Sequence, residues 1–178
     1  MRKWLFRILA TLALAAAFHV LTVMAFPRAI MVALSWKGKD LGRSSNVLYH
    51  QPRVTADSRV VVRPSPDLLY SVCAYDLSKA PLRISASVPD TYWSLSFFAS
   101  NTDNFFVIND REVQANPADI LLVGPAMSYK NPGNAQVVTS PSSRGVALIR
   151  ILITDENSIE ELTEIQRQAS CSPADQGL

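Results

Sequence analysis

The sequence predicts a mainly β protein: an antiparallel, jelly-roll-like β-sandwich with one N-terminal transmembrane helix and one C-terminal amphipathic helix. Three observations lead to this prediction. A basic flank precedes an uncharged apolar run from Ile8 to Phe26. Short apolar or alternating segments then recur about every ten residues, separated by turn residues, which is typical of sandwiches and barrels. Finally, residues 159–165 carry apolar side chains at helical spacing.

The apolar run from Ile8 to Phe26 is long enough for one membrane-spanning helix. At a rise of about 1.5 Å per residue it nearly crosses a hydrocarbon core of about 30 Å. We expect Pro27 to end or kink this helix. A cleaved signal peptide is the alternative, because Val23-Met24-Ala25 has the small residues that a signal peptidase accepts. The length of the run and a second apolar patch, Ile30 to Leu34, favour an uncleaved anchor.

Charge around the run predicts the orientation. Arg2, Lys3 and Arg7 precede the run, whereas Arg28 is the nearest basic residue after it. Because positive flanks stay in the cytoplasm, we expect the N terminus inside and the rest of the chain outside. The whole chain has a net charge of +2, but four of its 17 basic and none of its 15 acidic residues lie in residues 1–36. Residues 37–178 therefore carry −2, which gives no electrostatic basis for a nucleic-acid partner.

The chain divides into three parts: a membrane anchor (1–36), a tether (37–57) and an extracytoplasmic domain (58–178). The tether mixes charged, glycine and small polar residues without periodicity. Strands are expected within the domain at Val60–Val62, Leu68–Tyr75, Leu82–Ser87, Tyr92–Ala99, Phe105–Asn109, Ile120–Gly124, Gln136–Thr139 and Gly145–Ile153.

The last predicted element is a helix of about 12 residues that packs an apolar stripe on the sheet. Ser158-Ile159-Glu160-Glu161 fits a capping box at its start, and Cys171 and Pro173 follow its end. Cys171 could bridge to Cys73 in the strand Leu68–Tyr75 and hold the helix on the core, and an extracytoplasmic compartment would preserve such a bridge. The alternative is a buried Cys73 and a free Cys171 thiol.

One set of polar and aromatic residues offers candidate ligand contacts. Carboxylates and amides beside aromatic rings suit the recognition of a polar molecule such as a sugar. The same Asn and Asp residues are also common in the turns that join strands, so both interpretations stay open. The candidates are Asp67, Tyr70, Tyr92, Trp93, Asn101, Asp103, Asn104, Asn109, Asp110 and Arg111.

The sequence shows no catalytic residues and implies no cofactor. His50 is the only histidine outside the apolar run, so a histidine-ligated metal site cannot be assembled within one chain, and no Asp-x-Asp-x-Asp-Gly calcium loop is present. The chain also lacks a Gly-x-Ser-x-Gly elbow. These observations favour a binding or interaction module. The alternative is an envelope hydrolase or isomerase that uses carboxylates such as Asp67 and Asp103.

Several segments together resemble a known bacterial family, domain of unknown function 1254, in its short membrane-anchored form. They are Arg63 to Ser71, Tyr75-Asp76-Leu77-Ser78, Pro81-Leu82, Val88 to Ser94, Asn101 to Val107 and Asn109-Asp110-Arg111. The resemblance implies a β-sandwich-type domain and an envelope location, and it brings no established activity. We therefore expect a single-pass inner-membrane protein whose periplasmic domain binds another envelope protein or a polar small molecule.

Overall fold

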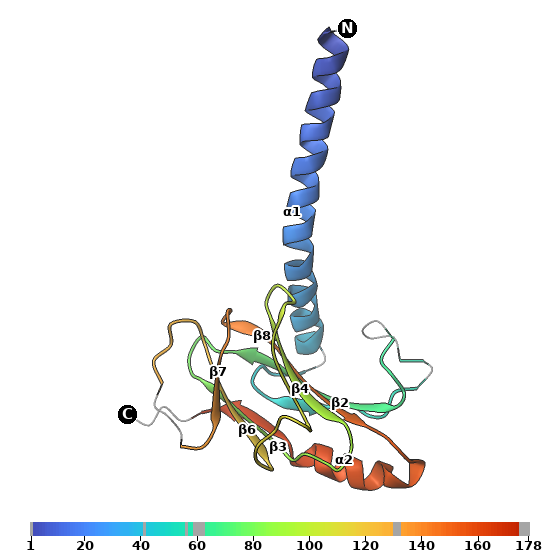
Figure 1. The fold of residues 1–178 in the computed structure, drawn as a ribbon, viewed down its shortest axis with the longest axis vertical. Coiled ribbons are helices and arrows are strands. Elements are labelled where there is room, and N and C mark those ends of the chain that lie inside the picture. Colours follow the sequence, from blue (N-terminus) through green and yellow to red (C-terminus); the bar gives the residue numbers. More distant parts are fainter. Residues whose placement is uncertain (1, 41, 56, 59–62, 130–132, 175–178) are drawn as a thin grey trace.

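A computed structural model of the chain describes residues 2–40, 42–55, 57–58, 63–129 and 133–174. One long helix projects from a domain made of two β-sheets and a short C-terminal helix (Figure 1). This arrangement confirms the predicted fold class. The expected strand Val60–Val62 lies outside the described residues.

Helix α1 (Arg2–Asp40) is long and apolar enough to cross a membrane, judged by length and composition. Pro27 was expected to end or kink it, but the helix continues beyond Pro27 to Asp40. In the turn before the proline, the Arg28 guanidinium donates to the Met24 carbonyl oxygen at 2.6 Å. Pro27 has no backbone N–H and therefore leaves one hydrogen bond of the helix unmade. The Arg28 side chain supplies an additional donor to the backbone in this same turn.

The first sheet, sheet A, has five antiparallel strands. Their order is β1 (Leu48–His50), β2 (Leu68–Asp76), β8 (Arg144–Leu152), β4 (Trp93–Ala99) and β5 (Asn104–Asn109). Strand β1 belongs to the segment expected as a tether, and Leu48 lies opposite Cys73 on β2. The connection from α1 is therefore tied to the edge of sheet A.

The second sheet, sheet B, has four strands. Their order is β7 (Gln136–Thr139), β6 (Ala118–Val123), β3 (Leu82–Ala86) and β9 (Ser170–Pro173). Strands β6 and β7 are parallel, whereas the other pairs are antiparallel. The sandwich is therefore antiparallel apart from this one pair, because the connection after β6 returns the chain to the end from which β6 began.

The two sheets enclose one hydrophobic core. Along β2 and β8 every second residue is buried, the period expected of strands with one face inward. The largest buried side chains come from both sheets, and they include Trp93, Tyr75, Phe97, Ile84, Leu95, Ile120, Leu122, Ile149 and Ile151.

The C-terminal helix begins differently from the prediction. A 3-10 turn, η1 (Glu156–Ser158), precedes α2 (Ile159–Gln168), and the Asp155 side chain caps this turn by accepting from the Asn157 N–H. Ser158 forms no side-chain cap, because its hydroxyl donates back to the Asp155 carbonyl oxygen at 2.7 Å. The helical segment therefore starts three residues earlier than the capping box indicated.

A disulfide joins Cys73 to Cys171, with their α-carbons 6.6 Å apart. Cys171 lies on β9, an edge strand of sheet B that the sequence analysis did not predict, whereas Cys73 lies on β2 of sheet A. The bridge therefore links the two sheets directly, and it holds helix α2 only through the strand that follows it.

Candidate functional site

The described structure has a groove at one end of the sandwich, which we call the distal groove. It consists of two adjoining pockets of about 530 and 360 Å³. Both pockets share residues 88–91 and Asn116, and the smaller one reaches helix α2. Helix α2 lies on the side of the domain opposite to the projecting part of α1 (Figure 1).

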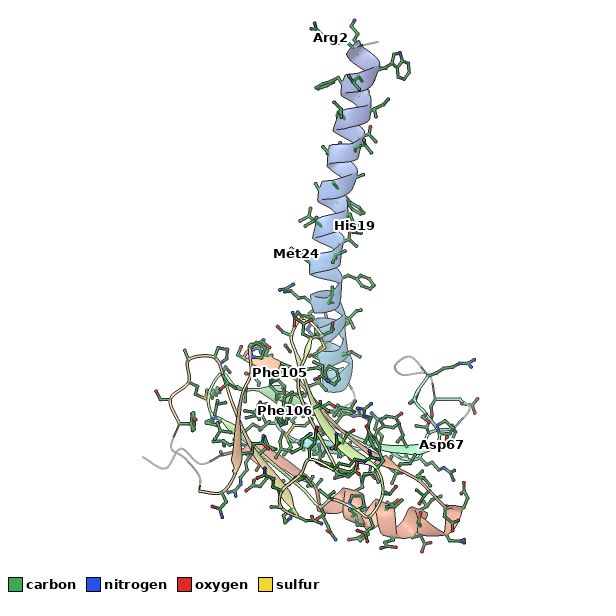
Figure 2. The ribbon with its side chains drawn as sticks, viewed as in Figure 1. Arg2, His19, Met24, Asp67, Phe105 and Phe106 are labelled. Carbon is green, nitrogen blue, oxygen red and sulfur yellow. A yellow bond between two sulfur atoms is a disulfide. The ribbon has the colours of Figure 1, made fainter. Side chains whose placement is uncertain are left out.

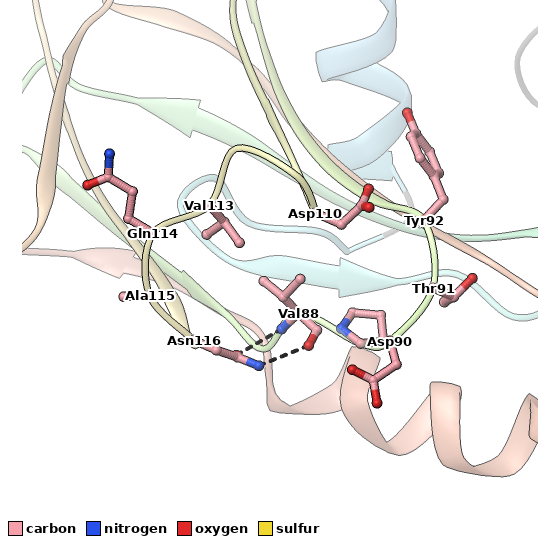
Figure 3. A pocket seen from close by; sticks show the side chains of 10 residues that line it. Val88, Asp90, Thr91, Tyr92, Asp110, Val113, Gln114, Ala115 and Asn116 are labelled. Atoms are coloured by element: carbon pink, nitrogen blue, oxygen red, sulfur yellow. Dashed lines mark hydrogen bonds between the residues drawn. The ribbon is translucent and has the colours of Figure 1, made fainter.

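Two loops form the walls of the groove: residues 87–92, between β3 and β4, and residues 110–117, between β5 and β6 (Figure 3). The Asn116 side chain fixes one loop to the other. Its Oδ1 accepts from the Val88 N–H at 3.0 Å, and its Nδ2 donates to the Val88 carbonyl oxygen at 2.9 Å. The Asp110 carboxylate accepts from the Trp93 N–H at 3.3 Å and joins the second loop to β4.

The lining combines negative charge with apolar surface. Asp90, Asp110 and Glu161 supply carboxylates, and Gln114 and Asn116 supply amides. No lysine, arginine or histidine is among the residues that line the two pockets. The apolar part of the lining is Val88, Pro89, Val113, Ala115, Leu162 and Ile165. The groove is thus suited to a ligand that carries positive charge or hydroxyl groups beside apolar surface.

The structure divides the ligand residues predicted from the sequence into separate groups. Tyr92 and Asp110 line the groove, and Asn109 and Arg111 stand in the adjacent turn, where the Asn109 side chain accepts from the Arg111 N–H. Trp93 is fully buried in the core. Its predicted role as a ligand contact is therefore wrong, because the side chain has no surface to offer.

A second group lies at the other end of the β4–β5 hairpin. Asn104 pairs with Phe98 there, whereas Asn109 pairs with Ser94 near the groove. The Asn101 side chain donates to the Asp103 carboxylate and also accepts from the Asp103 N–H at 3.3 Å. Asn101 and Asp103 thus stabilise a turn through hydrogen bonds to each other and to nearby backbone. This is the structural role that was the alternative to ligand binding for these residues.

The remaining candidates lie at the start of β2. The Asp67 carbonyl accepts from the Ile153 N–H, just beyond the end of β8, and the Tyr70 hydroxyl accepts from the Ser65 N–H at 2.9 Å. Figure 2 shows Asp67 at one side of the domain, away from Phe105 and Phe106 of the hairpin. The Asp103 carbonyl bonds to Ala99, which pairs with Gly145 near the start of β8.

The length of β8 therefore separates Asp67 from Asp103. Eight steps of about 3.3 Å, from Gly145 to Ile153, give a separation of about 26 Å. An acid–base pair needs both carboxyl groups at one reacting centre, within about 10 Å of each other. Asp67 and Asp103 of one chain therefore cannot act together as an acid–base pair.

Sequence reasoning missed Asp90, Gln114, Asn116 and Glu161 as groove residues. Asp90 lies between two predicted strands, Leu82–Ser87 and Tyr92–Ala99, and Glu161 was interpreted as part of a helix cap. Their shared location depends on packing α2 beside the β3–β4 loop, and no spacing in the sequence encodes that contact.

The described residues contain no group of three His, Cys, Asp or Glu side chains that could hold a metal ion.

One further polar cluster lies where β1 meets α2. The His50 Nδ1 lies 2.9 Å from the Ser71 hydroxyl oxygen, and Gln166 on α2 donates to the Tyr70 carbonyl oxygen at 3.0 Å. Partial burial lowers the pKa of His50, and the positive charge of Arg167 lowers it further. The cluster links the edge strand, β2 and the C-terminal helix, and it lies outside the groove lining.

One comparison with a known structure supports the fold. The VPA0106 protein from Vibrio parahaemolyticus superposes with a TM-score of 0.68 at 13% identity, over 85% of this chain and 36% of that one. An uncharacterized protein from Burkholderia cenocepacia gives a TM-score of 0.48 at 14% identity, over 91% of this chain and 42% of that one. This chain thus spans 36% and 42% of the length of the two proteins.

The sequence comparisons concern the family. No curated protein matches the chain. The family described as "Protein of unknown function (DUF1254)" matches residues 45–173, which include every strand from β1 to β9 and helix α2. The match confirms the resemblance carried by the segments between Arg63 and Arg111. The chain belongs to this family, DUF1254.

Proposed function

We propose that the chain is a single-pass inner-membrane protein that holds a periplasmic binding module at the membrane surface. The observation that carries this proposal is the exposure of α1. The most apolar window of this helix is not buried by the domain, and side chains such as Leu14 and Phe18 are each 72% exposed. A helix with apolar residues on all sides needs a lipid or protein surround, because water exposure of these side chains is unfavourable.

The orientation rests on charge and on cysteine chemistry. Arg2, Lys3 and Arg7 before the apolar run favour a cytoplasmic N terminus. The Cys73–Cys171 disulfide supports a domain outside the cytoplasm, because such bonds persist in oxidising compartments. An uncleaved anchor also agrees with the path of the helix, which continues without interruption to Asp40, close to strand β1.

The binding role rests on the distal groove. Its open shape, mixed lining and location on loops held by a two-sheet scaffold are typical of recognition sites. Among the lining residues there is no Cys or His, so a thiol nucleophile or an imidazole base would have to come from elsewhere. These features support binding of a partner or ligand over catalysis by the domain itself.

A fusion experiment tests the location. A phosphatase that folds only in the periplasm, attached after Leu178, should be active, and the full-length fusion should stay in the membrane fraction after alkaline carbonate washing. An inactive fusion would contradict the orientation. A soluble product that begins near Phe26 would show that the N-terminal segment is a cleaved signal.

A further inference from the structure

We infer that the distal groove binds a basic, partly apolar peptide segment of another envelope protein. This inference rests on the proposed function, which places the groove outside the cytoplasm. The first observation behind it is the separation of charge within the chain. The three segments around the groove, 87–92, 109–117 and 153–168, contain eight acidic and two basic residues, a net charge of −6. Because the whole chain carries +2, the remaining residues carry +8.

The second observation is that two groove carboxylates have no partner among the residues that the structure describes. In other parts of the described structure, arginine side chains neutralise Asp76, Asp119 and Glu156. Asp90 and Glu161 form neither an ion pair nor a side-chain hydrogen bond within the residues that the structure describes. Both residues are solvent exposed and line the smaller pocket. They are therefore available to a cation from outside the chain, and their charges attract one.

The third observation is the apolar floor beside these carboxylates. Ile165 is half-buried on the face of α2 that lines the smaller pocket, and the half-buried Val88 and Val113 continue this surface into the larger one. Leu162, which lines the same pocket as Ile165, is only 6% exposed and belongs mainly to the core. A small inorganic cation would leave that surface exposed. An extended peptide with alternating side chains can place an ammonium or guanidinium group on the carboxylates and an aliphatic group on the floor.

The location of the groove favours a protein segment over lipid. Helix α2 and the loops around the groove lie on the side of the domain away from the projecting α1 helix (Figure 1). Anionic headgroups at the membrane surface would also be repelled by a region with a net charge of −6. A basic segment of a neighbouring protein fits both the negative charge of the groove and its location away from α1, because the segment is positively charged and can reach the groove from the periplasmic side.

Peptide binding to the full chain in a neutral, non-ionic detergent tests this inference. The probe is a fluorescein-labelled pentapeptide, Gly-Lys-Val-Lys-Gly, measured by anisotropy at low and high salt. Matched probes replace both lysines by glutamate, or the valine by serine. Spermidine serves as a competitor that has positive charge without an apolar side chain. The protein variants are Asp90→Asn with Glu161→Gln, and the control Glu164→Gln, whose carboxylate faces Arg167 outside the groove.

The lysine–valine peptide should bind more tightly than either matched peptide, and its affinity should fall as salt is added. Loss of both groove carboxylates should weaken binding about tenfold, whereas the Glu164 control should change it less than about twofold. Equal binding of the glutamate peptide, unchanged binding to the double variant with an unchanged melting temperature, or no binding at millimolar peptide would overturn the inference. If spermidine competes as well as the unlabelled peptide does, positive charge alone is enough for binding, and the inference that a peptide occupies the groove is overturned. None of these outcomes depends on where the fusion reporter is active, so the two proposals can fail separately.

Discussion

The side chain of Asn116 takes the place of a backbone strand partner for Val88. Strands β3 and β6 pair in register as far as Ala86 and Ala118, and the same register would next bring Val88 opposite Asn116. Pro117 cannot donate a backbone hydrogen bond, so the backbone ladder stops there. The Asn116 amide instead donates to and accepts from the Val88 backbone, at 2.9 and 3.0 Å. The groove therefore begins where proline ends the sheet and a side chain keeps the two loops together.

Asn116→Ala should loosen both groove loops. The substitution removes two hydrogen bonds near the surface, and we expect the free energy of unfolding to fall by about 1–2 kcal/mol. Hydrogen exchange should increase at the Val88 amide. Asn116→Asp keeps the acceptor but not the donor, so it should give a smaller change. Equal exchange at Val88 in the parent and the alanine variant would contradict this role.

Replacing both cysteines by alanine should lower the stability of the domain strongly. The disulfide closes a loop with a sequence separation of 98 residues. For a loop of this size the chain-entropy model gives about 4–5 kcal/mol as an upper value. We expect the melting temperature to fall by about 10 °C or more, measured by thermal denaturation in detergent. Ser172→Ala, next to Cys171 on the same strand, is the matched control and should change the melting temperature little.

Acidification should destabilise the junction of β1 and α2 through His50. Its pKa in the folded protein lies below the ordinary value of 6.5, because of partial burial and the nearby positive charge of Arg167. The stability contributed by the neutral ring is thus complete above pH 6.5, and it declines as the pH falls towards and through the folded-state pKa.

The measurement is the melting temperature at pH 7.5 and 5.5. The parent chain should lose more stability than His50→Gln, which cannot be protonated. Asp76 is one of the described carboxylates whose titration could interfere. Burial alone would raise its pKa, but hydrogen bonds from Ser78 and the Arg144 ion pair outweigh burial and lower it, so Asp76 stays ionised over this range. An equal loss in both proteins would show that His50 does not contribute.

Substitutions at Trp93 and Tyr92 should separate core packing from groove lining. Trp93 is fully buried, so Trp93→Ala should cost about 3–5 kcal/mol of unfolding free energy. Tyr92 is 43% exposed, and Tyr92→Ala should cost about 1 kcal/mol or less. Trp93→Phe should be much milder than alanine, because the buried indole N–H has no hydrogen-bond partner to lose. A mild Trp93→Ala effect, measured by denaturant unfolding, would contradict the packing described above.

Local sequence patterns predicted the long strands well. Strands β2 and β8 have nine residues each, most of them apolar, so each is recognisable in the sequence as an apolar run bounded by polar residues. Strands β1 and β9 have only three and four residues. Too few side chains alternate in them to give a signal, and pairing with longer neighbours determines their conformation.

The candidate site was predictable only in part. Tyr92 and Asp110 were identified because aromatic and carboxylate residues cluster near them in sequence. The same clustering grouped Asp103 with them, but the β4–β5 hairpin places Asp103 and Asp110 at opposite ends of its strands. Asp90 and Glu161 are 71 positions apart and become neighbours of one pocket only through the packing of α2. Spacing along the chain contains no information about such a long-range contact.

Thiol labelling of intact spheroplasts tests most directly whether α1 holds the groove outside the cytoplasm. Because Cys73 and Cys171 form a disulfide, Gln114→Cys introduces a free thiol on an exposed groove residue, and Lys3→Cys introduces one before the apolar run. A membrane-impermeant maleimide added outside should label full-length, membrane-bound Gln114→Cys and should label Lys3→Cys only after lysis. Labelling of Gln114→Cys only after lysis would contradict a groove outside the cytoplasm, and external labelling of Lys3→Cys would contradict a cytoplasmic N terminus.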